Sequence, residues 1–328
     1  MKALILKVFA IVLVVVSVST TSVLADFPDM PADPVIKTTL EKAVENGLLT
    51  GYDTGEIRPY DKITRAQMAA IIVRALGAEA KADISKFPDM NPSQWHYDVM
   101  SKAVAMEAFQ GDGVNLNPEA NITFQEAFAV LARIFDLQTE YEVNKLKYDI
   151  GLIETRPEKD YYAIAKHADA SSVAEWAKPT TEAILEGGYW IAPNNLIRPT
   201  EHINRSEFAI LMNNLVTTYI DEPGNYDSLP AGNVVIRSND VMVDNLKADC
   251  DVFIGDGVKS GVVFGKDVEI DRLIIRGGQI GIGGIYNQVR MVGHNCITDI
   301  SYGPTVKIQL YVKYPGDCTV SLGMKELG

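Results

Sequence analysis

Two arginines stand at positions where a positive charge is electrostatically unfavourable. Arg65 follows Thr64 and Arg205 follows Asn204, and a Gln or Glu three residues after each cap predicts a helix start closed by a capping box. A cation in the first helical turn opposes the macrodipole by about 0.3–1 kcal/mol. Two interpretations remain for these arginines: an ion pair with a nearby surface acid, or an anion bound between the guanidinium and the free N–H groups of the helix start.

Both arginines belong to a pattern that occurs three times. Each copy has an Asp-led loop, a first helix, a polar loop ending in an apolar-x-Pro tripeptide, and a capped second helix. The tripeptides are Ile57-Arg58-Pro59, Leu116-Asn117-Pro118 and Ile197-Arg198-Pro199. In the second copy Phe124 follows the cap Thr123, where the other copies have arginine. Such an internal repeat predicts an architecture assembled from one supersecondary unit.

The first helix of each copy is predicted from apolar residues at helical spacing, which give one buried stripe per helix. These residues are Val35, Ile36, Leu40 and Val44, then Val99, Ala103 and Val104, then Ala183 and Ile184. Gly47 and Gly187-Gly188 are typical of helix C-termini. The second copy has Glu107 at this point, which predicts a different turn.

Residues 27–216 resemble the S-layer homology family, whose hallmark is a threefold repeat with an apolar-x-Pro step and an Ile-Thr-Arg-Ala-Glu helix start. The matching segments here begin Ile63-Thr64-Arg65-Ala66-Gln67, Ile122-Thr123-Phe124-Gln125-Glu126 and Ile203-Asn204-Arg205-Ser206-Glu207. The resemblance implies a pseudo-threefold helical bundle. It also implies that grooves between the repeats bind cell-wall polysaccharide that typically carries pyruvate ketals.

The resemblance assigns the motif arginine to the ketal carboxylate, which a planar guanidinium matches with two hydrogen bonds. Because Phe124 replaces that arginine, two competent grooves are expected instead of three. Two tryptophans near first-helix starts have two open interpretations, as core anchors or as sugar-stacking platforms. The expected glycan-binding residues are therefore Arg65, Arg205, Thr64, Asn204, Trp95 and Trp176.

Composition limits the classes of partner. The chain has 30 basic and 43 acidic residues, a net charge of −13 that becomes −15 without Lys2 and Lys7. Binding to nucleic acid is not expected, because it needs clustered cations. The three cysteines, Cys250, Cys296 and Cys318, lack metal-site spacing and are interpreted as buried thiols, with one disulfide as the alternative. Neither a metal nor a cofactor is expected.

The ends of the chain differ in character from the repeats. Residues 1–25 have a basic start, the apolar run Val8–Val16 and a small residue at Ala25, which predict a secretory signal peptide, with an uncleaved anchor as the alternative. No membrane contact is expected after its removal. The predicted domain order is 26–80 and 81–135 for two repeats, 136–166 for a segment of unknown role, 167–220 for the third repeat, 221–232 for a linker and 233–328 for a β domain.

Residues 233–328 contain a second repeat. Val241–Val243 and Val252–Ile254 recur 21 residues later as Val262–Phe264 and Leu273–Ile275, with Gly and Asx residues between the runs. This spacing predicts a short right-handed parallel β-helix, with a small antiparallel sandwich as the alternative. The overall fold class is α+β, an all-α bundle followed by an all-β domain.

The expected function is non-covalent anchoring of a secreted surface protein to the bacterial cell wall, with polysaccharide as partner and self-association as a further option. The alternative is a wall-anchored, glycan-active enzyme, for which the β domain offers carboxylates. These are Asp240, Asp244, Asp249, Asp251, Asp256, Asp267 and Asp271. No GxSxG, HExxH or P-loop motif occurs in the sequence, so catalysis is not the expected role.

Overall fold

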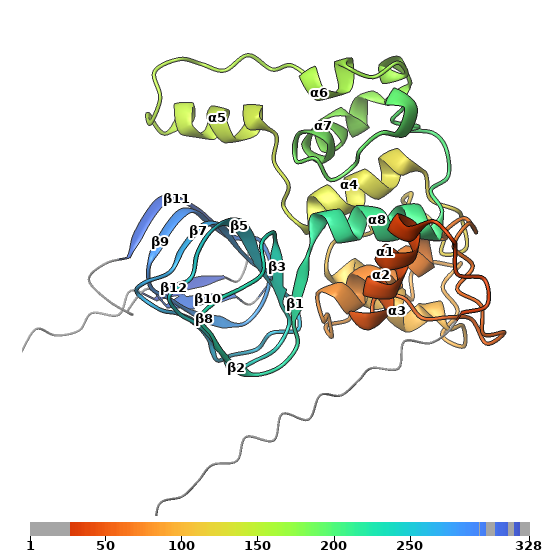
Figure 1. Ribbon diagram of the computed structural model, residues 1–328, viewed down its shortest axis with the longest axis horizontal. Coiled ribbons are helices and arrows are strands. Elements are labelled where there is room, and N and C mark those ends of the chain that lie inside the picture. The colour runs from red at the N-terminus through yellow and green to blue at the C-terminus, as the bar shows by residue number, and fades with distance from the viewer. Residues whose placement is uncertain (1–26, 295, 300–305, 314–317, 322–328) are drawn as a thin grey trace, which may run out of the picture.

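A computed structural model describes residues 27–294, 296–299, 306–313 and 318–321 (Figure 1). The predicted signal peptide lies outside the described residues. A helical region is followed by a β-solenoid, which confirms the predicted fold class. The helices are α1 (Pro34–Glu45), α2 (Arg65–Ala75), α3 (His96–Ala105), α4 (Phe124–Ile134), α5 (Glu140–Asp149), α6 (Tyr162–Ala165), α7 (Lys178–Glu186) and α8 (Arg205–Leu215), with short 3₁₀ turns at η1 (Ala170–Ser172), η2 (Glu175–Ala177) and η3 (Pro193–Asn195).

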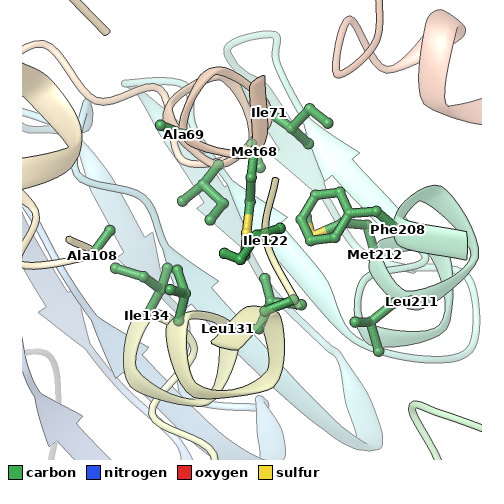
Figure 2. Close-up of a cluster of buried hydrophobic side chains, with 14 of the residues drawn as sticks. Met68, Ala69, Ile71, Ala108, Ile122, Leu131, Ile134, Phe208, Leu211 and Met212 are labelled. Atoms are coloured by element: carbon green, nitrogen blue, oxygen red, sulfur yellow. The ribbon is translucent and has the colours of Figure 1, made fainter. Parts of the chain in front are cut away.

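The second helices of the three repeats, α2, α4 and α8, form the centre of the helical region. Each begins at the residue after its predicted cap, Thr64, Thr123 or Asn204, and each has a capping box. Met68 of α2, Leu131 of α4 and Phe208 of α8 are fully buried and converge with Ile122 in the core shown in Figure 2. The first helices pack on the second helix of a different repeat, α1 on α8, α3 on α2 and α7 on α4. The repeats are therefore interlocked and do not form separate units.

A closed ring of backbone hydrogen bonds joins the three repeats. The amide of Ile63 donates to the carbonyl of Ile203, Ile203 donates to Ile122, and Ile122 donates to Ile63, each over 3.1 Å. All three side chains are fully buried. The ring fixes the residues before each second helix, and so it sets the direction in which the residue after each cap points.

An aspartate at the start of each repeat holds the apolar-x-Pro step in place. The carboxylate of Asp169 accepts hydrogen bonds from the amides of Ile197 at 2.9 Å and Arg198 at 2.7 Å. Asp29 and Asp89 make the same pair of bonds in the other repeats. The middle residue of each tripeptide has a positive φ of 51–59°, a conformation that L-residues rarely adopt. This arrangement, an aspartate that accepts from two successive amides, is called the aspartate clasp. It holds a strained backbone turn in each repeat.

One feature of the helical region differs from the sequence-based expectations. Glu107 has a φ of 62°, close to the 67° of Gly47 and Gly188, so the second repeat makes the same turn despite lacking glycine. The expectation of a different turn there was wrong, because tertiary packing imposes the left-handed conformation on Glu107. Residues 136–166 contain α5 and α6. Helix α6 contacts α7, whereas α5 buries none of its side chains.

The C-terminal region is a parallel β-solenoid, and within the described residues its strands form two six-stranded sheets. Every strand pair is parallel, so the antiparallel-sandwich alternative was wrong. One sheet contains β1 (Thr218–Ile220), β3 (Val234–Ile236), β5 (Lys247–Ile254), β7 (Glu269–Ile275), β9 (Ile285–Met291) and β11 (Lys307–Lys313). The other contains β2 (Gly224–Tyr226), β4 (Val241–Val243), β6 (Val262–Phe264), β8 (Gln279–Ile282), β10 (Ile297–Asp299) and β12 (Thr319–Ser321).

The 21-residue repeat sets the register of two strand pairs, β4 with β6 and β5 with β7, whereas other coils are shorter and Ile275 pairs with Met291. Val243 pairs with Phe264, and Val252 pairs with Leu273. The cysteines are free, buried thiols, as expected. The segment 221–232, for which the sequence predicts a linker, contains β2, which pairs with β4. Strand β1 lies just before this segment in the chain and pairs with β3. The first coil of the solenoid therefore follows α8 almost directly.

Buried arginines of the solenoid join it to the helical region. Arg276 donates to the carbonyls of Ile134 and Met106, both at 3.0 Å, and is paired with Asp256. These carbonyls lie at the C-terminal ends of α4 and α3, where the helix macrodipole favours a cation. The rings of Phe135 and Phe253 meet edge to face at 5.1 Å across the same boundary. The two regions thus share a polar and apolar interface.

The aspartate clasp is expected to be a major local source of stability. Asp169→Ala removes the acceptor of two part-buried amides and should lower the free energy of unfolding by about 2 kcal/mol. Asp227→Ala, which changes an exposed aspartate, is the matched control. Urea unfolding followed by circular dichroism measures both, and equal midpoints for the two variants would contradict the assigned role.

Candidate functional site

The N–H groups of the second-helix starts are already used by the protein. In α8 the amide of Arg205 donates to Asp61 at 3.0 Å, Ser206 donates to Pro59 at 2.8 Å, and Glu207 donates to the cap Asn204 at 2.9 Å. Helix α2 makes the corresponding bonds. The hypothesis of an anion held by free helix-start amides was therefore wrong, because the loop of the next repeat occupies them. The cap side chains of Thr64 and Asn204 are likewise bound to the backbone.

Arg205 is a buried cation that is fixed against the loop after α1. Its Nε donates to the carbonyl of Ile57 at 2.9 Å, and its Nη2 donates to the carbonyl of Thr50 at 3.1 Å. The guanidinium lies 4.9 Å from the centroid of the Tyr52 ring. Burial lowers the pKa of Arg205, but an arginine stays charged in proteins. Two of its five N–H donors are therefore committed to the backbone, which leaves donors for a ligand.

Arg65 has the equivalent arrangement in the next repeat. Its Nε donates to the carbonyl of Leu116 at 2.9 Å, and its guanidinium lies 4.9 Å from the Phe109 ring. Burial lowers the pKa of Arg65, and the carboxylates of Glu126 and Asp112 act in the opposite direction. The surroundings of Arg65 are thus more acidic than those of Arg205, whose pKa is lowered further by the nearby charges of Arg74 and Arg58.

The third equivalent position is apolar. Phe124 is fully buried, and its ring centroid lies 4.9 Å from that of Trp190. The guanidinium of Arg198 covers Phe124 at 4.4 Å and forms a 2.8 Å ion pair with Glu207. The cation at this position is therefore supplied by a different residue and is bound to an acid.

A pocket of about 460 Å³ opens beside Arg205 and draws residues from all three repeats. The first repeat contributes Tyr52 and Arg74, the second contributes Trp95 and Glu119, and the third contributes Arg205. The hydroxyl of Tyr52 accepts a 3.0 Å hydrogen bond from Gln67, which also lines the pocket. The lining thus combines two cations and two aromatic rings with two acids, Asp53 and Glu119, so a bound acidic group would have to lie against the arginines.

Both predicted tryptophans lie at the surface. Trp95 is 57% exposed and Trp176, on η2, is 58% exposed, which excludes the core-anchor interpretation. Trp95 lies in the pocket with Arg205, whereas Trp176 is not among the residues that line it. A large exposed indole beside a pocket is available for stacking on a sugar ring.

Two residues of this pocket, Arg74 and Tyr52, were not among the expected glycan-binding residues. Arg74 lies nine positions after Arg65, and its Nη1 donates to the carbonyl of Leu48 at 3.1 Å. Arg133 lies nine positions after Phe124 and donates to Ala108 at 3.0 Å. An arginine nine positions after the residue that follows the cap therefore occurs in two repeats, and this recurrence can be seen in the sequence. Tyr52 lies in a loop that varies between the repeats, and only the fold places it against Arg205.

The described residues were also searched for metal-ion sites and for membrane-spanning helices. In the part of the chain that the structure describes, no group of His, Cys, Asp or Glu side chains is placed to hold a metal ion. The helices described there are all too short or too polar to cross a bilayer.

Comparison with known proteins finds a family that matches part of the helical region. Residues 26–69 and 86–128 match the S-layer homology domain family. These segments contain the first two repeats up to the early part of each second helix. The third repeat lies outside the matched residues and is recognised from its equivalent clasp, cap and ring.

Relatives include surface proteins and a hydrolase. The chain is 25% identical over 261 residues to the surface-layer 125 kDa protein of Lysinibacillus sphaericus, covering 78% of this chain and 19% of the relative. It is 24% identical over 170 residues to the S-layer protein of Bacillus thuringiensis subsp. finitimus, covering 51% and 21%. An amylopullulanase of Thermoanaerobacterium thermosulfurigenes is 23% identical over 181 residues, covering 55% and 9%.

The chain thus spans about a fifth or less of the length of these relatives. Two segments of the helical region match S-layer homology domains, and the helical region is followed by a parallel β-solenoid.

Proposed function

We propose that the helical region anchors the protein to the bacterial cell wall by binding an acidic wall polysaccharide in the Arg205 pocket. The observation that carries the proposal is the convergence of Arg205, Arg74, Tyr52 and Trp95 on one pocket. The match to S-layer homology domains supports a cell-surface location and a wall-polysaccharide partner in general. A secreted, wall-held surface protein is the role that fits both.

The remaining N–H donors of Arg205 are suited to a carboxylate such as that of a pyruvate ketal. Charge-assisted hydrogen bonds between guanidinium and carboxylate are stronger than neutral ones. Trp95 provides an apolar surface for the sugar ring that carries the acid. Because its Nε and one Nη2 proton are bound to carbonyls, Arg205 is held rigidly, so little side-chain entropy is lost on binding.

The grooves are expected to differ in their affinity for the wall polysaccharide. Arg65 is a second, weaker site, because Asp112 and Glu126 reduce the positive potential around it. At the third position Phe124 replaces the motif arginine. The nearby Arg198 forms an ion pair with Glu207 and is therefore not expected to bind a carboxylate. We expect one dominant groove and one auxiliary groove.

Removing Arg205 should weaken attachment to the wall. Arg205→Ala is expected to reduce affinity for purified cell-wall sacculi at least about tenfold, because a charge-assisted contact is lost. Arg65→Ala should have a smaller effect, and Arg156→Ala, an exposed arginine outside the grooves, is the control. Co-sedimentation with sacculi measures all three.

A second pair of measurements separates binding from folding. Trp95→Ala changes an exposed side chain, so it should reduce affinity without loss of helical circular dichroism. Chemical removal of ketal pyruvate from the sacculi should abolish the difference between wild type and Arg205→Ala. Unchanged binding by both Arg205→Ala and Trp95→Ala would refute the proposed pocket.

Asp112 is predicted to weaken the Arg65 groove. Hydrogen bonds from the Asn115 amide, the Asn117 side chain and the Val114 amide hold the pKa of Asp112 at about 2. Its carboxylate is therefore ionised at any pH above about 4, and the stability it contributes is lost only as the pH falls from about 4 toward 2.

In the Arg205→Ala background, Asp112→Asn should raise wall affinity roughly threefold by removing a like charge. The gain should be equal at pH 5 and pH 7, because Asp112 does not titrate between them, and it should shrink in high salt. Co-sedimentation at the two pH values measures it. No gain at either pH would show that Asp112 does not affect this groove.

A further inference from the structure

Helix α5 forms one wall of a groove whose other wall is the solenoid. The groove has a volume of about 430 Å³ and lies between α5 and strands β7, β9 and β11. Figure 1 shows α5 standing apart from the helical bundle, above this sheet. Its N-terminus is fixed by the capping box of Thr139 and by a 2.8 Å bond from the Glu140 amide to Glu186. A half-buried helix that is anchored at one end and has no fully buried side chain is not explained by core packing.

The groove is rich in carboxamide side chains. The α5 side contributes Gln138 and Asn144, and the solenoid contributes Asn287, Gln288 and Gln309. A carboxamide offers two donors and one acceptor oxygen, and so it matches a hydroxyl group, which both donates and accepts. The lining residues come from two regions of the fold, so the sequence alone does not bring them together.

Two of these amides have buried oxygens that lack a partner. The Oε1 atoms of Gln138 and Gln288 are buried and accept no hydrogen bond from the residues that the structure describes. Gln288 is only 7% exposed, and both residues line the groove from opposite walls. A buried, unsatisfied acceptor is unfavourable, so a donor from outside the chain is expected here.

The charges in the groove balance. Its ionisable lining residues are two acids and two bases, Glu140, Asp271, Lys147 and Arg272. Arg272 is bound to Asp251 through two hydrogen bonds, and Asp271 accepts a 2.7 Å bond from Asn287. The lining therefore carries no net charge that would favour an anion or a cation. The groove therefore suits an uncharged ligand with several hydroxyl groups.

We propose that this groove binds neutral sugar units of a polysaccharide. Hydroxyl groups of the sugar donate to Oε1 of Gln138 and Gln288, and the amide nitrogens of Asn144 and Gln309 donate to its oxygens. The site is separate from the Arg205 pocket and does not depend on an acidic substituent. It also gives the segment between the second and third repeats a role as one wall of the site.

The test uses the full mature chain and soluble neutral hexasaccharides of β-1,4-glucose, α-1,4-glucose, β-1,4-xylose and β-1,4-N-acetylglucosamine. Isothermal titration calorimetry should detect binding of at least one of them to wild type. Gln288→Leu should weaken that binding about tenfold, whereas Gln279→Leu, an exposed glutamine on β8, should leave it unchanged. Asn144→Ala provides a second variant outside the core, because Asn144 is half-buried on α5, which has no fully buried side chain.

Several outcomes would overturn the proposal. If none of the hexasaccharides binds wild type, the groove holds water only. If binding survives both Gln288→Leu and Asn144→Ala, the sugar binds elsewhere. Arg205→Ala separates the two sites, because it should leave hexasaccharide binding intact while weakening attachment to sacculi. Loss of hexasaccharide binding in Arg205→Ala alone would move the sugar to the wall-binding pocket and refute this assignment.

Discussion

The helical region depends on the ring of hydrogen bonds between Ile63, Ile122 and Ile203. Each isoleucine donates to one neighbouring repeat and accepts from the other, so the ring closes only when all three repeats are present. The first amides of each second helix then bond to the loop of another repeat, as Arg205 does with Asp61. This exchange leaves no helix start free for a ligand, and it places the residue after each cap at a boundary between repeats.

The interlocked arrangement explains why the candidate pocket has a mixed origin. Arg205 comes from the third repeat, Tyr52 and Arg74 from the first, and Trp95 from the second. Similar residues in the three repeats therefore acquire different surroundings. Loop changes of one repeat alter the groove whose arginine belongs to another, as Asp112 does for Arg65. Three repeats with the same fold can in this way form binding sites of unequal affinity.

Local signals in the sequence were sufficient for most of the fold. Caps and apolar-x-Pro steps predicted the second helices, and the 21-residue spacing predicted the parallel register of two strand pairs, β4 with β6 and β5 with β7. These features are local or strictly periodic, so their physical meaning does not depend on distant partners. The turn at Glu107 was mispredicted because packing overrides the preference of an L-residue against positive φ.

The candidate site was less accessible from the sequence. The opposition of Arg65 and Arg205 to the helix macrodipole marked them as candidate ligand-binding residues, and part of the explanation for their position is structural, because both bind backbone carbonyls. Those carbonyls lie about 50 and 150 positions away in the chain. The exposure of Trp95 and the amide-lined groove beneath α5 likewise depend on contacts between distant segments.

The central claim is that the Arg205 pocket is the principal wall-binding site. The most direct measurement is an NMR titration with soluble pyruvylated wall polysaccharide that follows the Arg Nε–H and Trp indole N–H signals. The signals of Arg205 and Trp95 should shift at the lowest ligand concentrations, before those of Arg65 and Trp176. Shifts of Arg65 and Trp176 with no change at Arg205 and Trp95 would contradict the account.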